Sequence, residues 1–227
     1  MNKHIIITGT SRGIGFEMVK RFAELGYSVH ALSRNDRPVQ VLRYQQCHSY
    51  SCDLSNEESI KSILNTIRQQ TDSVEMIINN AAKLINRPFL ETSLDDVKSV
   101  YNTNIFGVFA ITSMCMKMFT GIKHVVNISS MGGIQGSTKF PGLAAYSTSK
   151  AALICLTELL AEEFKEEPIA FNCLALGAVQ TEMLEEAFPG FQAPVNALEM
   201  AEHIVEFAIT GHKFYNGKTL QVSNSTP

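Results

Sequence analysis

Tyr146 and Lys150 lie four residues apart, and this spacing suits proton-transfer chemistry. On a helix, residues four apart share one face, so an ammonium group would lie beside a phenol. A phenol ordinarily has a pKa of about 10, and a neighbouring cation favours the phenolate and lowers that pKa. The pair therefore predicts a tyrosine that acts as general acid or base on a carbonyl/alcohol pair. The same spacing also occurs on ordinary helix surfaces, so it needs support from other residues.

A glycine-rich turn near the N-terminus indicates a nucleotide site. Gly9, Gly13 and Gly15 follow a short apolar run at His4–Thr8 and precede a helical pattern at Phe16–Leu25. Glycines at a strand-to-helix turn let the backbone approach a pyrophosphate, whose charge is stabilised at the helix N-terminus. The alternative is that these glycines serve only a tight turn. Their position directly after the first strand favours the nucleotide.

The end of the second expected strand bears on which cofactor binds. An acidic residue there would accept the ribose 2′-hydroxyl of NAD, but the sequence has Ser33 and Arg34, and Arg12 lies in the glycine turn. Two guanidinium groups suit a 2′-phosphate, so we predict that NADP(H) is preferred over NAD(H). Either arginine could instead be plain surface. We interpret Asp36, the nearest acid, as a loop residue; a contact between it and the ribose would reverse the preference.

Strand and helix patterns alternate along the whole chain, which predicts an α/β fold. A doubly wound, Rossmann-type parallel β-sheet flanked by helices on both faces accounts for apolar strands in this alternation. No linker or repeat interrupts the pattern, so residues 1–227 are expected to form one domain with the catalytic site built in. The expected strands are His4–Thr8, Tyr27–Ser33, Cys47–Cys52, Val74–Ile78, Val125–Ile128, Ile169–Leu174 and Thr219–Val222. The expected helices are Phe16–Leu25, a helix capped by Ser55 and running to about Gln70, a helix from Ser93 to about Phe119, Ala144–Glu166 and Ala197–Ile209.

Composition argues against several other classes of protein. A net charge of −3 gives no basic surface, so nucleic acid is not an expected partner. No apolar run approaches the roughly 18 residues of a membrane span, and the N-terminus reaches glycine too soon for a signal peptide. Five cysteines without a C-x-x-C pair predict reduced core residues of a cytoplasmic protein. The six histidines are scattered, so no metal site is expected.

With these residues assembled, the chain from Ile5 to about Val222 resembles the classical short-chain dehydrogenases/reductases. Thr8–Gly15 matches the family's cofactor motif T-G-x-x-x-G-x-G, Asp53 resembles its adenine-contacting aspartate, and Asn79–Ala82 is close to its N-N-A-G motif. The resemblance implies a catalytic set of Asn104, Ser130, Tyr146 and Lys150. Together, the motifs and the resemblance place the cofactor site at Gly9, Ser11, Arg12, Gly13, Ile14, Gly15, Ser33, Arg34, Asp53, Leu54, Asn80, Ala81, Ala82, Tyr146, Lys150, Gly177, Val179 and Thr181.

The resemblance also implies a role for each catalytic residue. Tyr146 would donate the proton in carbonyl reduction or accept it in alcohol oxidation, and Ser130 would hydrogen-bond the substrate oxygen. Lys150 would hold the nicotinamide ribose hydroxyls and lower the pKa of Tyr146. Asn104 would position a water that links Lys150 to solvent. Because side chains alternate along a strand, Ser129 points away from Ser130 and is expected to be structural.

Three departures from the family pattern concern the substrate side of the site. The interval from Ser130 to Tyr146 is about three residues longer than in the family and is rich in glycine, which predicts a mobile or bulged loop beside the pocket. Alternatively, this loop displaces Ser130 and cripples the site. Leu176 replaces the proline of the P-G-x-V-x-T motif, so the backbone that contacts the nicotinamide amide is expected to be less rigid. The lid segment, residues 182–195, is short, which suggests an open pocket and a bulky or loosely selected substrate. Its apolar residues are expected either to line the pocket or to belong to the core or to one face of an amphipathic helix: Met183, Leu184, Phe188 and Phe191.

The helical segments at Asn104–Phe119 and Tyr146–Phe164 carry more apolar residues than one sheet face requires. They include Met114, Met116, Leu153, Leu156 and Leu160. This surplus, together with the family's habit of pairing through these helices, predicts a homodimer or homotetramer.

The sequence as a whole predicts an NADP(H)-dependent oxidoreductase that interconverts a small-molecule carbonyl and its alcohol by hydride transfer. The first alternative is a non-catalytic NAD(P)-binding regulator or scaffold, which would have no need of a tuned phenol. The second is an isomerase or epimerase on the same fold.

Overall fold

Seven strands form a single parallel sheet in the computed structural model, which describes residues 3–223. The strand order is β3-β2-β1-β4-β5-β6-β9, and every neighbouring pair is parallel. The chain therefore winds outward from β1 in one direction and from β4 in the other, which confirms the predicted doubly wound sheet. The carboxyl ends of the strands open a crevice where the winding reverses. The strands are β1 (His4–Thr8), β2 (Ser28–Ser33), β3 (Cys47–Ser51), β4 (Met76–Asn79), β5 (His124–Ser130), β6 (Ala170–Leu176) and β9 (Thr219–Val222).

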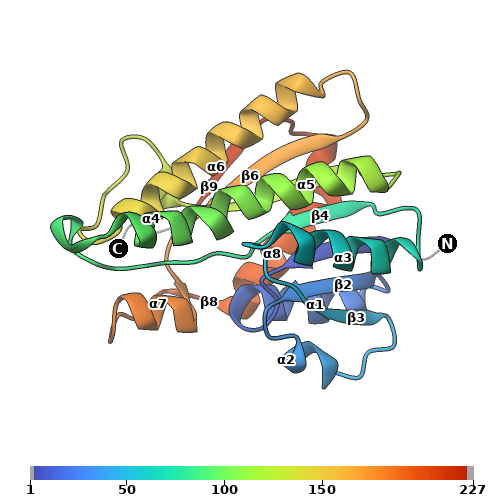
Figure 1. Ribbon diagram of the computed structural model, residues 1–227, viewed down its shortest axis with the longest axis horizontal. Helices are drawn as coiled ribbons and strands as arrows, with labels where there is room; N and C mark the ends of the chain where they lie inside the picture. Colours follow the sequence, from blue (N-terminus) through green and yellow to red (C-terminus); the bar gives the residue numbers. More distant parts are fainter. Residues whose placement is uncertain (1–2, 224–227) are drawn as a thin grey trace.

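Helices cover both faces of this sheet (Figure 1). On one face, α1 (Gly13–Glu24) packs beside α8 (Ala197–Thr210); on the other lie α3 (Glu57–Arg68), α5 (Gly107–Met118) and α6 (Ala144–Glu163). Each layer has its own apolar core. The central strands are buried on both sides: Ile5, Ile6 and Ile7 of β1 have no exposed surface, and all of β6 is buried. This double burial explains why the strands appear in the sequence as continuous apolar runs.

Two helix starts show how local hydrogen bonding sets the boundaries. The expected cap of α3 at Ser55 is wrong, because Ser55 donates both its N–H and its hydroxyl to Asp53 Oδ1. Asn56 is the cap instead: its backbone is extended and its Oδ1 accepts from the Ser59 N–H at 3.1 Å. The predicted cap at Ser93 is confirmed and forms a full capping box with Asp96.

The long helix expected from Ser93 to Phe119 is interrupted. It begins as α4 (Leu94–Tyr101), passes through a π-helical turn at Asn102–Phe106, and continues as α5. A π turn inserts an extra residue into the helix and is often found at functional sites. Four short elements also escaped the sequence patterns: α2 (Arg37–Gln40), β7 (Val179–Gln180), α7 (Glu182–Ala187) and β8 (Val195–Asn196), of which β7 and β8 pair with each other.

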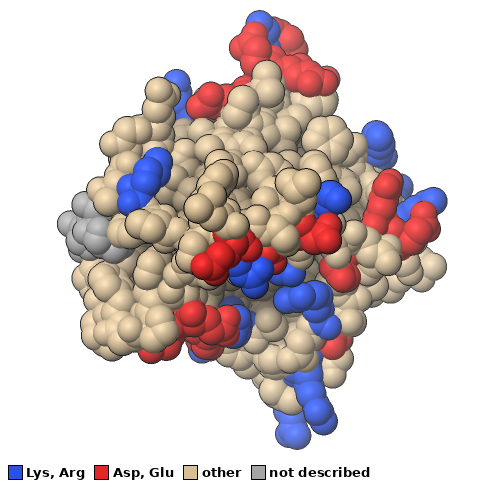
Figure 2. All heavy atoms as spheres, turned by 60° about the vertical axis from the view of Figure 1, so that its left-hand side comes forward, with Lys and Arg blue, Asp and Glu red and all other residues tan. Residues whose placement is uncertain are grey.

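The remaining expectations from composition concern cysteines, metals and membranes. All five cysteines are free; Cys52, Cys115 and Cys173 are buried, but Cys155 is exposed on α6 and is not a core residue. Within residues 3–223 we find no helix long and apolar enough to cross a membrane, and no group of His, Cys, Asp or Glu side chains arranged to hold a metal ion. Figure 2 shows charges of both signs interspersed on the face that it presents, between large uncharged areas.

Candidate active site

A cavity of about 360 Å³ lies at the carboxyl ends of the central strands, where the crevice opens. Its wall is formed by the glycine turn after β1, the ends of β2, β4, β5 and β6, the start of α6, and α7. All the residues predicted for cofactor binding line it, as do Ser130, Tyr146 and Lys150. Asn104 is the only predicted site residue that is not part of the wall. The fold thus brings together motifs that span most of the sequence.

The glycine turn leaves a cradle that a side chain would fill. Gly9 has a left-handed backbone (φ +74°), and a Cβ there would lie 2.6 Å from the Cα of Ala81. A Cβ on Gly15 would lie 2.1 Å from the carbonyl oxygen of Gly9 and 2.6 Å from Asn80 Nδ2. Backbone atoms cannot yield as a flexible side chain does, so both positions require glycine. The tight turn brings the N-terminus of α1 to the edge of the cavity.

The N-terminus of α1 has the properties of an anion site. Arg12 occupies the cap position without a side-chain hydrogen bond to the first turn, and that turn has no acidic residue. The helices α3, α4 and α8 are instead capped by Asn56, Ser93 and Asn196. The first N–H groups of α1 therefore face the cavity without a competing cap. Together with the glycine cradle, they fit the pyrophosphate of a dinucleotide.

The end of β2 forms the part of the cavity expected to hold the adenosine ribose. Ser33, Arg34 and Asn35 line it, and the Ser33 hydroxyl donates to the Asn35 carbonyl at 2.8 Å. Asp36 is not part of the wall; it precedes α2, and its carboxylate accepts from the amide of Gln40, the last residue of that helix, at 2.7 Å. The interpretation of Asp36 as a loop residue is therefore confirmed. Hydroxyl, guanidinium and amide side chains of Ser33, Arg34 and Asn35 line this end of the cavity, and Arg34 also lowers the pKa of the Asp53 carboxylate on the same wall.

Arg12 reaches across the cavity from the glycine turn to α7. Its guanidinium forms a two-point ion pair with Glu186, with Nη1–Oε1 at 2.5 Å and Nη2–Oε2 at 3.2 Å. Arg12 thus lines the cavity together with Arg34, but it already has a carboxylate partner. No sequence pattern indicated this pair, because its members are 174 residues apart.

The phenol and the ammonium group meet where β5 ends and α6 begins. Lys150 is 2% exposed, and its Nζ donates to the carbonyl of Ile128 at 2.7 Å and lies 5.7 Å from the centre of the Tyr146 ring. The hydroxyl of Ser130 hydrogen-bonds Tyr146 and also accepts from the Gly132 N–H at 3.1 Å. Ser130 is therefore at the site, and the longer loop after it has not displaced it.

The pKa of Tyr146 differs from the expectation. Burial raises it to about 12, while the hydrogen bond from Ser130 acts in the opposite direction. The prediction that Lys150 lowers this pKa is wrong in this structure, because removal of the phenol from water dominates and the ammonium is directed at the Ile128 carbonyl. Burial also lowers the pKa of Lys150 to about 8. Tyr146 is accordingly a protonated phenol at neutral pH.

Asn104 lies in the π turn, outside the cavity wall, and hydrogen-bonds residues in or next to that wall. Its Oδ1 accepts from the Lys83 N–H at 2.7 Å, and its Nδ2 donates to the Lys83 carbonyl at 3.0 Å and to the Ser149 hydroxyl at 2.9 Å. The side chain is fully buried. It therefore ties the segment after β4 to α6, one residue before Lys150.

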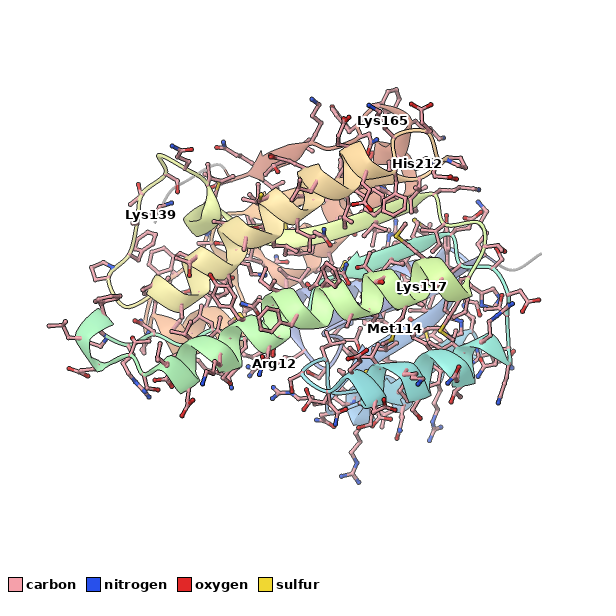
Figure 3. All side chains as sticks on the ribbon, turned by 45° about the horizontal axis from the view of Figure 1, so that its top comes forward. Arg12, Met114, Lys117, Lys139, Lys165 and His212 are labelled. Carbon is pink, nitrogen blue, oxygen red and sulfur yellow. The ribbon has the colours of Figure 1, made fainter. Side chains whose placement is uncertain are left out.

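Ser129 and the loop before α6 shape the neighbouring wall. The Ser129 hydroxyl donates to the carbonyl of Lys150 at 2.8 Å, which is the structural contact expected from strand alternation. The loop folds back on itself around Lys139, whose ammonium donates to the carbonyls of Gly132 at 2.9 Å and Ile134 at 2.6 Å. Lys139 lies at one end of α6, opposite Lys165 at the other (Figure 3). Phe140, the next residue, lines the cavity.

The segment Leu176–Thr181 is held by its backbone despite the missing proline. The Gly177 N–H donates to the Val222 carbonyl at 2.9 Å, and Val179 begins β7. Thr181 caps α7 by accepting from the Leu184 N–H at 3.3 Å. Gly177, Val179 and Thr181 all line the cavity. The strand pairing thus supplies the rigidity that a proline would give.

The short lid segment forms α7, which covers one side of the cavity. Met183, Leu184 and Phe188 line the cavity as expected, but Phe191 does not. Two contacts fix α7 across the opening. The Asn86 amide donates to the Ala187 carbonyl at 2.7 Å, and the rings of Phe140 and Phe188 meet edge to face with centres 5.8 Å apart.

Several residues of the wall were missed at the sequence level, among them Asn35, Lys83, Phe140 and Leu143. Asn35 and Lys83 directly follow recognised motifs, so their position after a strand end was the available signal. Phe140 and Leu143 lie in the loop before α6, where no periodicity marks the inward-facing residues.

Comparison with known proteins gives consistent matches. Residues 3–191 match the family model of the short chain dehydrogenases. The chain is 27% identical to the 3-oxoacyl-(acyl-carrier-protein) reductase FabG of Chlamydia trachomatis, covering 98% of this chain and 96% of that protein. It is 32% identical to carbonyl reductase family member 4 of Danio rerio, covering 81% and 78%.

Solved structures agree over nearly the whole chain. A 4-hydroxyisoleucine dehydrogenase complexed with NADH superimposes with a TM-score of 0.88 at 28% identity, covering 99% of this chain and 98% of the other. ElxO with NADP bound gives a TM-score of 0.87 at 27% identity, covering 98% and 97%.

Proposed function

Because this chain belongs to the short-chain dehydrogenase/reductase family, we propose that it is an NADP(H)-dependent reductase that converts a small-molecule carbonyl to its alcohol. The observation that carries the proposal is the meeting of Ser130, Tyr146 and Lys150 with the glycine cradle in one cavity. When bound, the nicotinamide supplies the hydride, and the protein supplies orientation and the proton.

Proton donation follows from the state of Tyr146. With a pKa of about 12, its phenol keeps its proton at neutral pH and is poised to donate it to a carbonyl oxygen that gains negative charge. Ser130, which hydrogen-bonds the same phenol, would donate to that oxygen as well and stabilise the developing charge. Carbonyl reduction requires Tyr146 in this protonated state, whereas alcohol oxidation requires the same group to act as a base.

Lys150 and Asn104 would complete the proton path. Lys150 lies one helical turn from Tyr146 with a buried ammonium group, which places it to hold the ribose hydroxyls and to stabilise the phenolate left after proton donation. Asn104 fixes Ser149 and Lys83 on either side of this group. A water bound near Asn104 would return the proton from solvent.

The cofactor preference is supported by the charges at the adenosine end. Arg12 and Arg34 line that end, and Asp36, the acid nearest to the end of β2, is not part of the wall and is hydrogen-bonded to Gln40. The glycine cradle and the uncapped N-terminus of α1 fit the pyrophosphate of either dinucleotide. Similar structures are described with NADP and with NADH, so NAD(H) is the alternative cofactor for this chain.

Thermal unfolding with each cofactor tests this preference. A ligand that binds only the folded state stabilises it by about 2.7 kcal/mol at one hundred times its Kd. We expect NADP⁺ to raise the Tm clearly and NAD⁺ to raise it less at the same concentration. A larger shift with NAD⁺ would contradict the assignment of Arg12 and Arg34 while leaving the oxidoreductase in place.

The substrate end of the cavity is apolar. Beyond Ser130 and Tyr146, its wall consists of Leu84, Met131, Phe140, Leu143, Met183, Leu184 and Phe188. Such a wall suits a carbonyl compound with an uncharged apolar body next to the reacting carbon. The acyl-carrier and carbonyl reductases among the relatives act on compounds of the carbonyl class by name.

We expect the whole site to lie within one domain of a cytoplasmic protein.

An apolar surface beside the site supports a homo-oligomer. The residues named from the sequence are largely packed against the core; the exposed apolar residues on these helices are Phe106, Phe109 and Leu159, each about 60% exposed. The helix α5 carries no charge before Lys117. Pairing with the same surface of a second copy would bury these side chains. Light scattering is expected to give a mass of two or four chains, and a mass of one chain would contradict the pairing.

A further inference from the structure

The ion pair with Glu186 occupies the guanidinium group of Arg12, which the proposed NADP(H) site would use to bind the 2′-phosphate. Arg12 belongs to the glycine turn and is labelled in Figure 3, whereas Glu186 lies near the end of α7. Both nitrogens of the guanidinium edge are engaged, at 2.5 and 3.2 Å. This planar edge is the one that binds carboxylates and phosphates in two-point geometry. A 2′-phosphate that approached Arg12 would therefore meet a guanidinium whose favoured edge is taken.

The surroundings of Arg12 favour its carboxylate partner. Glu17 of α1 and Glu182, Glu185 and Glu186 of α7 line the groove into which Arg12 extends. Glu17 is paired with Lys20 at 2.5 Å, and both Glu186 and Glu182 raise the pKa of Arg12. The acidic residues of α7 thus form a negative edge next to the position where a phosphate dianion would bind. The negative charges of this edge disfavour binding of the phosphate dianion beside them.

Arg34 differs from Arg12 in this respect. It lies at the end of β2 on the wall of the same cavity, and among the ion pairs of residues 3–223 none involves Arg34. Arg34 lowers the pKa of the Asp53 carboxylate but forms no ion pair with it. A 2′-phosphate could therefore bind Arg34 without breaking an ion pair, but would gain Arg12 only by displacing a carboxylate.

From this geometry we propose that Glu186 determines cofactor selectivity by competing with the 2′-phosphate of NADP(H) for Arg12. The inference rests on the cofactor part of the proposed function. NADH has no 2′-phosphate, so it binds without disturbing the pair and α7 stays fastened to the glycine turn. NADPH must break the ion pair between Arg12 and Glu186. This lowers the affinity for NADPH and removes that contact between α7 and the glycine turn. Glu186 thereby reduces the ratio of NADP(H) affinity to NAD(H) affinity that the two arginines create.

The test is a double-mutant cycle on Arg12 and Glu186 read by cofactor affinity. Dissociation constants for NADPH and NADH are measured by fluorescence titration at one ionic strength. Removing the competitor with Glu186→Gln is expected to lower the Kd for NADPH about two- to fivefold and to leave the Kd for NADH unchanged, since an exposed ion pair is worth an effect of that size. In an Arg12→Gln background, Glu186→Gln is expected to have no effect on either cofactor.

The matched control is Glu185→Gln, one residue earlier on α7. Glu185 accepts from the Gly190 N–H at 3.0 Å, a bond that the amide oxygen of glutamine preserves, and it makes no ion pair with Arg12. We expect this variant to lower the Kd for NADPH clearly less than Glu186→Gln does, because it removes one charge of the α7 edge without freeing Arg12, and to leave the Kd for NADH unchanged. If it tightens NADPH as much as Glu186→Gln does, the effect comes from the general charge of α7 and the specific competition is wrong.

Other outcomes would also overturn the inference. Equal changes for NADPH and NADH, no change for either, or an effect that persists without Arg12 would each show that Glu186 does not compete with a 2′-phosphate. Adenosine 2′,5′-bisphosphate and adenosine 5′-monophosphate repeat the comparison without the nicotinamide. Should the bisphosphate show the Glu186 effect while no carbonyl compound is reduced, the competition holds and the proposed reductase activity fails. A wild-type protein that binds none of these ligands would contradict both the competition by Glu186 and the proposed reductase.

Discussion

Replacing Tyr146 with phenylalanine is expected to lower kcat for carbonyl reduction by about a thousandfold or more and to leave the Kd for NADPH within about twofold. The substitution removes one hydroxyl and keeps the ring that lies 5.7 Å from Lys150 Nζ. Among residues 3–223, that hydroxyl is the only phenol on the wall of the cavity, and it hydrogen-bonds Ser130, the other group expected at the substrate oxygen. Steady-state rates of NADPH oxidation and a fluorescence titration of the cofactor provide the two readouts.

The control for this prediction is Tyr101→Phe. Tyr101 ends α4, stacks obliquely against Phe106 and does not line the cavity, so loss of its hydroxyl is expected to leave kcat unchanged. A Tyr146→Phe protein that retained more than about a tenth of wild-type turnover would show that another group donates the proton.

Replacing Gly15 with alanine is expected to weaken binding of both cofactors by about ten- to a hundredfold and to destabilise the fold by about 1–3 kcal/mol. The added Cβ would lie 2.1 Å from the Gly9 carbonyl oxygen and 2.6 Å from Asn80 Nδ2. Asn80 Nδ2 in turn donates to the carbonyls of Thr8 and Gly9 at 3.1 Å, so the clash would be transmitted to the whole turn. The first turn of α1 would move away from the position that favours a pyrophosphate. Cofactor titration and chemical denaturation measure the two effects.

Gly26→Ala, at the other end of α1, separates backbone strain from damage to the site. Gly26 has φ +82°, but a Cβ there would meet no atom within 4 Å. The substitution is expected to cost about 1 kcal/mol in stability and to leave cofactor affinity unchanged. If Gly15→Ala bound NADPH as tightly as this control does, the glycine turn would not be the pyrophosphate cradle.

The sheet and the cofactor wall could be predicted because both depend on short stretches of sequence. Strands buried on two faces must be apolar throughout, so β1 and β6 were visible as runs such as Ile5–Ile7. Parallel strands bring their carboxyl ends to one edge, which places the glycine turn, Asp53, Asn80 and Ser130 around a common cavity. Each of these positions could be found from its place after a strand.

The features that escaped prediction depend on contacts distant in sequence. The π turn at Asn102–Phe106 has no periodicity of its own, because the helix on either side continues in the same direction. The pKa of Tyr146 depends on how completely the folded chain excludes water from the phenol, and spacing alone could reveal only the nearby charge of Lys150. The pairing of Arg12 with Glu186 required the position of α7, a six-residue helix whose place relative to the glycine turn the sequence pattern could not indicate.

The most direct test of the reductase is transfer of a labelled hydride. The protein is incubated with NADPH deuterated at both C4 positions and a panel of aldehydes, ketones and 3-oxoacyl thioesters, and the products are analysed by mass spectrometry. We predict an alcohol with one deuterium on the former carbonyl carbon, formed in equal amount to the NADP⁺ produced and absent with the Tyr146→Phe protein. A wild-type protein that binds NADPH but transfers deuterium to none of these compounds would contradict the reductase and favour a non-catalytic NADP(H)-binding scaffold.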